Sequence, residues 1–404
     1  MNRTLSLASL LLVACASGGR GPSDDPSDGA DSSDADTGSV LDAGCRSTPR
    51  AADSDRIVLV SLPYNDDLSF ALDWAVMRLD AAGDLVDTST RLALGTARTG
   101  RLRFTPDGSV GITPLDDGTL GVVGVSEDSE PVVLQAGFDP GTHVSALAID
   151  PRGESVWLVN PNWPDNGGGL WRADIDCDSG HVGAARLVIA AKNPAAIVLV
   201  DHQGSRGILV GREIPGAGSG ADLALVDLDS GAVIDGSDAF GDEEAIVSDA
   251  VLSASGWLLA ADHSEFSGVP NRIAAVQLDG DRFGEPVVVP DIYDPVSIVP
   301  NPSGPGALVP SGYGDQYWLL GEAPGTAEPW FIDRALAEGN QPGVELPDDA
   351  IAIDRGSLAG HVLSVEVGGI RQINLEATGS GRLGGITDFG AGYSGIPGAI
   401  GVQP

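Results

Sequence analysis

The chain has 404 residues, of which 42% are hydrophobic, so it is long and apolar enough to bury a large core. It carries 58 acidic residues against 22 lysines and arginines, a formal net charge of −36. A field of this sign repels phosphate backbones and anionic lipid headgroups. It therefore argues against nucleic acid as a partner and against electrostatic docking to a membrane.

Residues 1–14 have the pattern of an export signal, with a basic Arg3, an apolar stretch and small residues before Cys15. The stretch is too short to remain as a membrane-spanning helix. Its end, Leu12-Val13-Ala14-Cys15, resembles the lipobox of bacterial lipoproteins; the alternative is an ordinary signal peptide with a chance cysteine. The resemblance implies cleavage before Cys15 and lipidation of that cysteine. Ala16 in the next position then favours the outer membrane or cell surface over the inner membrane.

Residues 15–52 are rich in Ser, Gly, Asp and Pro and nearly lack large apolar side chains. Such a segment cannot bury enough surface to offset the entropy lost on ordering it. We therefore expect a solvated, acidic tether that joins the lipid to one folded domain over 53–404.

From Arg56 onward the sequence repeats a four-part unit. Each unit opens with an apolar run and a tight turn that ends in glycine, and three more short apolar runs follow. Four short strands at a regular period predict the blade of a β-propeller, whereas a β-sandwich has no reason to repeat a four-strand unit. The turn glycines, separated by 45, 51, 52, 48 and 52 residues, are Gly108, Gly153, Gly204, Gly256, Gly304 and Gly356.

The two ends of the repeating region complete each other. Residues 56–95 supply a second, a third and a fourth strand, and residues 394–404, SGIPGAIGVQP, supply only an inner strand. We therefore predict a blade in which the C-terminal strand joins three N-terminal ones and leaves no open sheet edge. The predicted fold is an all-β, seven-bladed β-propeller of four-stranded blades, and a closed ring of this kind is expected to be a monomer.

The inner-strand motif P-x-A-I-x-x-x-P-x-G, around Ala148, Ala196, Ser297 and Ala399, resembles the repeats of lactonase-like and WD40- or YVTN-type propellers. The resemblance extends over the repeating region, 53–404, and implies its fold. Propellers of this group include sugar-lactone hydrolases, binding modules and surface proteins. The resemblance therefore implies no single activity.

Propeller topology places the two remaining cysteines on one face. Loops that lead into inner strands, and loops between second and third strands, surround the central funnel. The other turns, and Arg56 where the tether joins the domain, lie on the opposite face. Cys45 precedes Arg56 by 11 residues, a reach of at most about 36–40 Å, and Cys177 lies in a hairpin on the tether face. In an oxidising compartment we expect a Cys45–Cys177 disulfide, against the alternative of two free thiols.

The funnel-face loops carry the candidate site residues. His143 and His263 are the candidates for a general base. Carboxylates on this face suit a hard divalent cation such as Ca²⁺, and the candidate ligands are Asp66, Asp67, Asp262, Asp348 and Asp349. Asp249 lies at another inner-strand entrance. Other candidates for ligand contacts are Trp163, Arg212, Glu213, Tyr313 and Asp315.

Three functions fit this sequence. The first is a lipid-anchored, extracytoplasmic module that binds or scaffolds a protein or glycan of the cell envelope. The alternative is a metal-assisted lactone or sugar-ester hydrolase that uses the funnel carboxylates, and a purely structural envelope protein is the third. The sequence contains no G-x-S-x-G, H-E-x-x-H or C-x-x-C motif and no phosphate-binding P-loop. Convergence of the five candidate carboxylates within ligand distance of one ion would favour the hydrolase.

Overall fold

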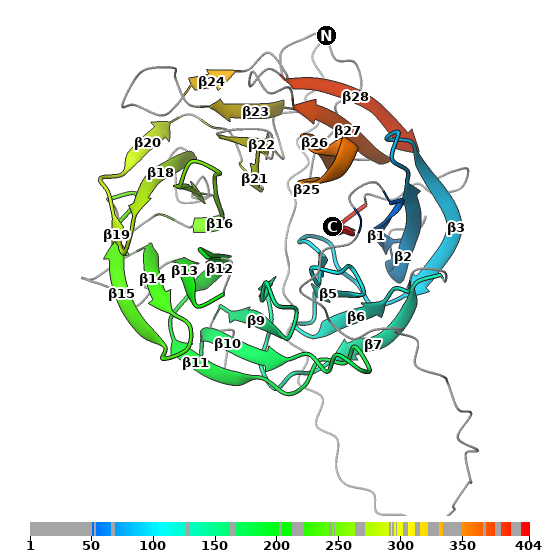
Figure 1. The fold of residues 1–404 in the computed structure, drawn as a ribbon, viewed down its shortest axis with the longest axis horizontal. Helices are drawn as coiled ribbons and strands as arrows, with labels where there is room; N and C mark the ends of the chain where they lie inside the picture. The colour runs from blue at the N-terminus through cyan, green and yellow to red at the C-terminus, as the bar shows by residue number, and fades with distance from the viewer. Residues whose placement is uncertain are drawn as a thin grey trace, which may run out of the picture. The chain divides into compact units, whose positions relative to one another are not determined.

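Seven antiparallel sheets form the blades of a β-propeller in the computed structural model (Figure 1). The predicted all-β, seven-bladed architecture is confirmed. The structure describes residues 51, 54–65, 69–126, 130–161, 167–201, 204–211, 222–241, 245, 247–262, 271–290, 292, 295, 297–301, 306–311, 316–321, 331–333, 349–366, 369–375, 381–388 and 397–404.

Blades 1 to 4 each contain four strands, ordered from the inner strand outward. Blade 1 consists of β29 (Ile400–Val402), β1 (Arg56–Tyr64), β2 (Phe70–Leu79) and β3 (Leu85–Ala93). Blade 2 consists of β4 (Arg103–Phe104), β5 (Val110–Pro114), β6 (Leu120–Gly124) and β7 (Val132–Phe138). Blade 3 consists of β8 (Ala146–Ile149), β9 (Ser155–Asn160), β10 (Gly169–Asp174) and β11 (Arg186–Ala190). Blade 4 consists of β12 (Pro194–Leu199), β13 (Arg206–Gly211), β14 (Leu223–Asp227) and β15 (Ala232–Ser237).

Blades 5 to 7 follow the same plan, except that the outer strand of blade 5 is split in two. Blade 5 consists of β16 (Val247–Leu252), β17 (Trp257–Asp262) and β18 (Arg272–Asp279), with β19 (Arg282–Phe283) and β20 (Val287–Pro290) both paired to β18. Blade 6 consists of β21 (Val299–Pro300), β22 (Ala307–Ser311), β23 (Gln316–Gly321) and β24 (Phe331–Asp333). Blade 7 consists of β25 (Asp349–Ala352), β26 (His361–Glu366), β27 (Gly369–Leu375) and β28 (Gly381–Asp388).

The hydrophobic core lies between the blades. Each of seven buried clusters joins side chains of two neighbouring blades. In β1, Val58 and Val60 pack toward blade 7, whereas Leu59 packs toward blade 2, as the two-residue period of a strand requires. Because both faces of such a strand are buried, its sequence is a continuous apolar run without alternation.

The repeated turn glycines are needed for their backbone conformation. Gly108, Gly153, Gly204, Gly256 and Gly356 all have positive φ, between 65° and 84°. In the first four turns, the glycine N–H donates to the carbonyl three residues earlier, at 2.8 to 3.2 Å. Only glycine adopts this conformation without steric cost, so it recurs wherever an inner strand turns back into the second strand.

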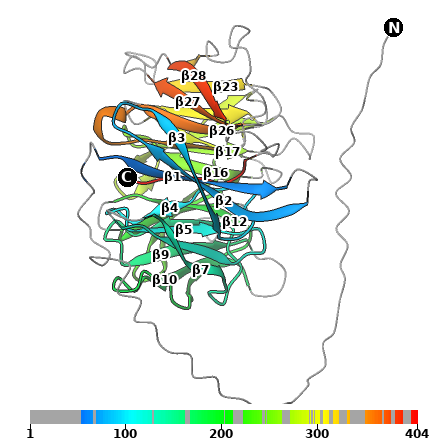
Figure 2. The same ribbon diagram turned by 90° about the vertical axis from the view of Figure 1, so that its right-hand side faces the viewer.

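The C-terminal strand closes the ring. β29 pairs with β1 through the registers Val58↔Val402, Leu59↔Gly401 and Val60↔Ile400. The two views agree that the C-terminus lies beside β1 (Figures 1 and 2). The Leu102 N–H also donates to Ile400 O at 2.9 Å, which ties the closing strand to blade 2. The predicted composite blade is therefore confirmed.

Residues 1–50 lie outside the described residues. They include the proposed signal peptide, the lipidation residue Cys15, Cys45 and nearly all of the tether over 15–52. Within the described ranges, no helix has the length and apolarity needed to cross a bilayer.

Candidate functional site

One position of the repeat lines the inner end of the funnel in six blades. It is the seventh residue before each turn glycine, close to the start of the inner strand. These side chains surround a cavity of about 350 Å³, which we call the funnel pocket. In blades 2 to 7 the position is occupied by Arg101, Ala146, Ile197, Asp249, Ser297 and Asp349.

Arg101 crosses the funnel pocket from blade 2 to three other blades. Its Nη2 donates to Asp249 Oδ2 at 2.9 Å and to Ile298 O at 2.9 Å. Its Nε donates to Asp349 Oδ1 at 3.2 Å and to Ala350 O at 3.0 Å. One guanidinium thus joins blade 2 to blades 5, 6 and 7 and supplies the counter-charge of two carboxylates.

Burial shapes the ionisation of this cluster. The Arg101 side chain is 10% exposed; burial lowers its pKa, but the charges of Asp249 and Asp349 outweigh this and raise it overall. Burial raises the pKa of Asp349, and the nearby Arg101 charge offsets only part of that rise. The cluster is therefore a desolvated ion-pair network and not a solvated loop contact.

Arg103 lies two residues further along the chain. It lines the funnel pocket and also a second cavity, at the opposite ends of the inner strands. We call the space between these two cavities, which the inner strands surround, the channel. Residues two apart in a strand face the same side, so Arg103 points toward the channel as Arg101 does. Among the described residues, no hydrogen bond or ion pair reaches its guanidinium. Burial and the neighbouring Arg101 charge lower its pKa to about 10.

Two serines also line the funnel pocket. Ser248 directly precedes Asp249. Ser297 occupies in blade 6 the position that Asp249 occupies in blade 5. Both hydroxyl oxygens are buried, and neither has a hydrogen-bond partner in the described part of the chain. An unpaired buried hydroxyl costs free energy, so a group that reaches these two positions gains hydrogen bonds.

Three of the candidate catalytic and metal-binding residues lie within the described residues. His143 packs over the β5–β6 turn, where its ring leaves no room for a side chain at Gly118. Asp262 is buried at the end of β17, and its Oδ2 accepts a hydrogen bond from Arg272 Nε at 2.8 Å. Asp349 binds Arg101 in the funnel pocket. The three lie on different blades.

The other loop candidates lie outside the described residues. They are Asp66, Asp67, Trp163, Arg212, Glu213, His263, Tyr313, Asp315 and Asp348.

The described residues offer no cation site. No three His, Cys, Asp or Glu side chains of the described ranges come together in an arrangement that would hold a metal ion. Asp262 and Asp349, the two described candidates for a Ca²⁺ ligand, are each bound by an arginine. A cation at either carboxylate would have to displace that guanidinium.

Cys177 follows β10 in the hairpin that leads to β11. The Ile175 N–H donates to Glu154 O at 2.9 Å, which places this hairpin beside the β8–β9 turn, at the ends of the inner strands away from the funnel pocket. This is the face on which Arg56 begins β1, as the topology predicted. Cys45 lies outside the described residues, and its pairing with Cys177 stays a prediction that a thiol count on the non-reduced protein would test.

Sequence reasoning missed the residues that build the pocket, except for Asp349 and Asp249. Arg101 and Arg103 belong to the sequence RLRF, which occupies the same place in its repeat as the other inner-strand runs. Aligning the repeats on their turn glycines could have revealed these residues, because Arg101, Asp249 and Asp349 then occupy the same position of their repeats. Two acids and a base at equivalent positions of a ring predict contact across its centre.

Comparisons with known proteins support the fold. No protein-family model and no curated protein sequence matches the chain. The structure of a "putative 6-phosphogluconolactonase" from Bacteroides fragilis superimposes with a TM-score of 0.57 at 11% identity, over 88% of this chain and 100% of that one. Its counterpart from Bacteroides uniformis gives 0.56 at 14% identity, over 86% and 99%. A protein from Lactobacillus plantarum gives 0.54 at 14% identity, over 86% and 100%.

The chain resembles lactonase-like propellers in fold. Identities of 11% and 14% extend that similarity to the architecture alone.

Proposed function

We propose that the protein is a binding module whose funnel pocket takes a small, uncharged ligand rich in hydroxyl groups, such as a sugar unit of an envelope glycan. The observation that carries this proposal is the pair of buried, unpartnered hydroxyls of Ser248 and Ser297 in that pocket. Sugar hydroxyls both donate and accept, so they satisfy serine hydroxyls of either orientation.

Charge and size support the same ligand class. The formal charges of Arg101 and Arg103 balance those of Asp249 and Asp349, so the pocket has no net preference for an ion. Its volume of about 350 Å³ is at the small end of ligand cavities, which suits one sugar ring and not a peptide segment.

The location in the cell is part of the proposal. We place the module outside the cytoplasm, anchored through a lipid on Cys15 and a tether over 15–52, because residues 1–15 have the pattern of a lipoprotein signal. The anchor predicts that radiolabelled palmitate is incorporated into the wild-type protein in bacterial cells. A Cys15→Ala variant should not be labelled, and equal labelling of the two would contradict the anchor.

The binding test uses purified full-length chain, titrated calorimetrically with a panel of monosaccharides and disaccharides. We expect at least one sugar to bind, and Ser248→Ala and Ser297→Ala each to weaken it about 3- to 10-fold, the effect of losing one neutral hydrogen bond. The matched control is Ser230→Ala, which removes a hydroxyl from an exposed hairpin far from the pocket. Binding that is equal in all four proteins, or absent for every sugar, would contradict the proposal.

Hydrolysis of a lactone or sugar ester is the second candidate. It is favoured by Asp349, a carboxyl in the funnel pocket whose pKa is raised by burial, and by the fold shared with the two Bacteroides proteins. The assay follows ring opening of glucono-lactone by pH-stat, with and without Ca²⁺ or EDTA. Turnover that Asp349→Asn abolishes while the melting temperature holds would support hydrolysis. Turnover no faster than the rate in buffer alone would contradict the hydrolase proposal.

A further inference from the structure

A second cavity lies at the opposite ends of the inner strands. It has a volume of about 550 Å³ and is lined by residues of blades 1, 2, 3 and 7. The ends of four inner strands, at Phe104, Ile149, Ala352 and Val402, contribute to its wall. We call it the arginine pocket, and its charged lining residues are Arg56, Arg103, Arg152, Arg355 and Asp354.

The charge of this pocket is opposite to that of the protein. Four of the chain's 22 basic residues line it, against one acidic side chain, in a protein with a net charge of −36. Clustering of one sign of charge in a partly enclosed site strengthens the local field. An anion that the rest of the surface repels is therefore attracted to this position.

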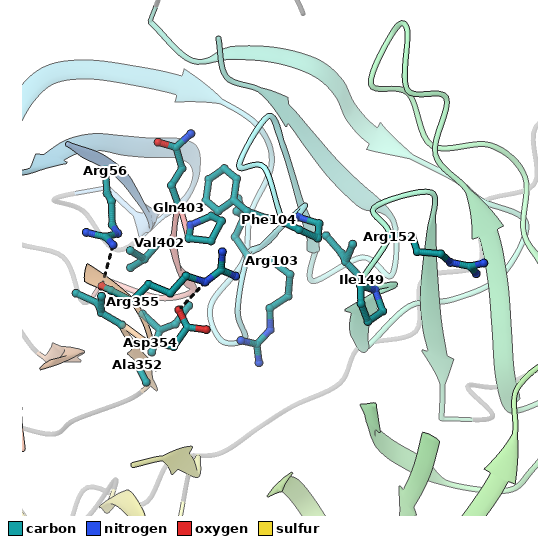
Figure 3. A pocket seen from close by; sticks show the side chains of 16 residues that line it. Arg56, Arg103, Phe104, Ile149, Arg152, Ala352, Asp354, Arg355, Val402 and Gln403 are labelled. Atoms are coloured by element: carbon teal, nitrogen blue, oxygen red, sulfur yellow. Dashed lines mark hydrogen bonds and ion pairs between the residues drawn. The ribbon is translucent and has the colours of Figure 1, made fainter. Parts of the chain in front are cut away.

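Arg103 and Arg355 have bonding capacity to spare. No hydrogen bond or ion pair to the Arg103 guanidinium is found within the described ranges. The Arg355 Nη1 is buried and lacks a hydrogen-bond partner there, and its Nε lies 3.6 Å from Asp354, a side chain that is 66% exposed. Figure 3 shows both side chains among the residues that line the pocket, Arg103 from the inner strand of blade 2 and Arg355, beside Asp354, from the turn after β25.

The other two arginines have different roles. Arg56 is 1% exposed and donates from Nη2 to Arg355 O at 2.9 Å, so it adds charge and fixes the backbone of the facing turn. Arg152 pairs with Asp150 at 3.0 Å, and its guanidinium is directed away from the others (Figure 3). Recognition in this pocket therefore depends on Arg103 and Arg355.

We propose that the arginine pocket binds a small anion carrying carboxylate or phosphate groups. A guanidinium presents a planar fork of donors that matches either group in two hydrogen bonds. The Arg103 guanidinium and the Arg355 Nη1 have no hydrogen-bond partner among the described residues, and an anion in the pocket pairs with these donors. Arg103 lines both pockets, whereas Arg355 lines the arginine pocket and not the funnel pocket, so Arg355 distinguishes the two sites.

The test is calorimetric titration of the full-length chain at low ionic strength with citrate, with pyrophosphate and with glucose. We expect citrate or pyrophosphate to bind, and any binding of glucose to be unaffected by Arg355→Gln. Stronger binding of citrate would identify a carboxylate ligand, and stronger binding of pyrophosphate a phosphate ligand. Arg355→Gln should weaken the anion about 10- to 100-fold, the cost of losing hydrogen bonds to a charged group, and Arg355→Lys less.

Two controls separate this site from others. Arg186→Gln removes the same charge from the exposed surface of β11 and should leave the affinity unchanged. Ser248→Ala and Ser297→Ala alter only the funnel pocket and should also leave it unchanged, so failure of the sugar proposal does not affect this one. Melting temperatures show whether each variant is folded. Arg103→Gln should also weaken binding of the anion; if that variant does not fold, the result with Arg355→Gln alone tests the proposal. No binding of either anion, unchanged affinity in Arg355→Gln, or an equal loss in Arg186→Gln would overturn the proposal.

Discussion

Arg101 holds four blades with one side chain. Its partners are two carboxylates and two backbone carbonyls on blades 5, 6 and 7, and all of them face the channel. A buried network of this kind stabilises when every member is satisfied, and it becomes costly when one member is removed.

Replacement of Arg101 by methionine is therefore expected to destabilise the protein by about 3 kcal/mol, because the buried Asp349 and the partly buried Asp249 lose their counter-charge. Urea denaturation measures the change. The double variant Arg101→Met with Asp349→Asn should be more stable than Arg101→Met alone, since it removes one of the stranded charges. A double variant less stable than the single one would show that the charge argument is wrong.

Asp222 predicts a specific pH dependence. Its side chain is 2% exposed, and burial raises its pKa to about 7, although the Phe240 N–H, 3.2 Å from Oδ2, favours the charged form. The unfolded chain releases this proton near pH 4, whereas the native protein keeps it until about pH 7. Its contribution to stability is thus complete below pH 4 and is lost as the pH rises toward 7.

The Asp222→Asn variant lacks this titration and should retain the hydrogen bond from Phe240. We expect the free energy of unfolding of the wild type, relative to the variant, to fall by about 2 kcal/mol between pH 5 and pH 8. Asp229→Asn, in the exposed turn after β14, is the control and should show no such change. A constant difference between wild type and Asp222→Asn would contradict the raised pKa.

Gln403 locks the closing strand. Its Oε1 accepts from the Ile57 N–H at 2.9 Å, and its Nε2 donates to Gly108 O at 2.8 Å, so one buried side chain joins β29 to β1 and to the first inner-strand turn. Gln403→Ala leaves both backbone groups unpaired and should cost about 2–4 kcal/mol in unfolding free energy. Gln277→Ala, on the exposed side of β18, is the control and should be nearly neutral. Equal stability of the alanine variant and the wild type would show that the lock is unimportant.

The strands were predictable because their signals are local. An apolar run, a positive-φ glycine and a second run recur within a few residues of each other, as around Gly108 and Gly153. The closing of the ring by the C-terminal strand could be predicted by counting the apolar runs in each repeat. The site was less predictable because its contacts are remote: Arg101 meets Asp249 and Asp349 across 148 and 248 residues. Asp349 was noticed as a carboxylate suited to a cation, but nothing near it in the sequence shows that an arginine supplies the charge.

The whole protein combines a strongly negative surface with a positive channel end. Because 58 acids face 22 bases, self-repulsion opposes the folded state, and salt screens it over about 10 Å at 0.1 M. We expect the melting temperature to rise by roughly 2–4 °C, about 1 kcal/mol, when NaCl is raised from 10 to 200 mM. Circular dichroism follows the transition, and sucrose at equal osmolarity serves as the control. A lower melting temperature in salt would mean that ion pairs such as Arg101–Asp349 outweigh the repulsion.

The composite first blade has a consequence for synthesis. Ile57 and Gln403, which bond to each other, are 346 residues apart, so β1 is synthesised long before its inner partner β29. Until then the nascent chain carries three paired strands with an unpaired inner edge, a template for wrong pairing. This blade can be completed only after β29 has been synthesised. A chaperone that covers strand edges is therefore expected to bind this protein before β29 pairs with β1 and to release it once that pairing has formed.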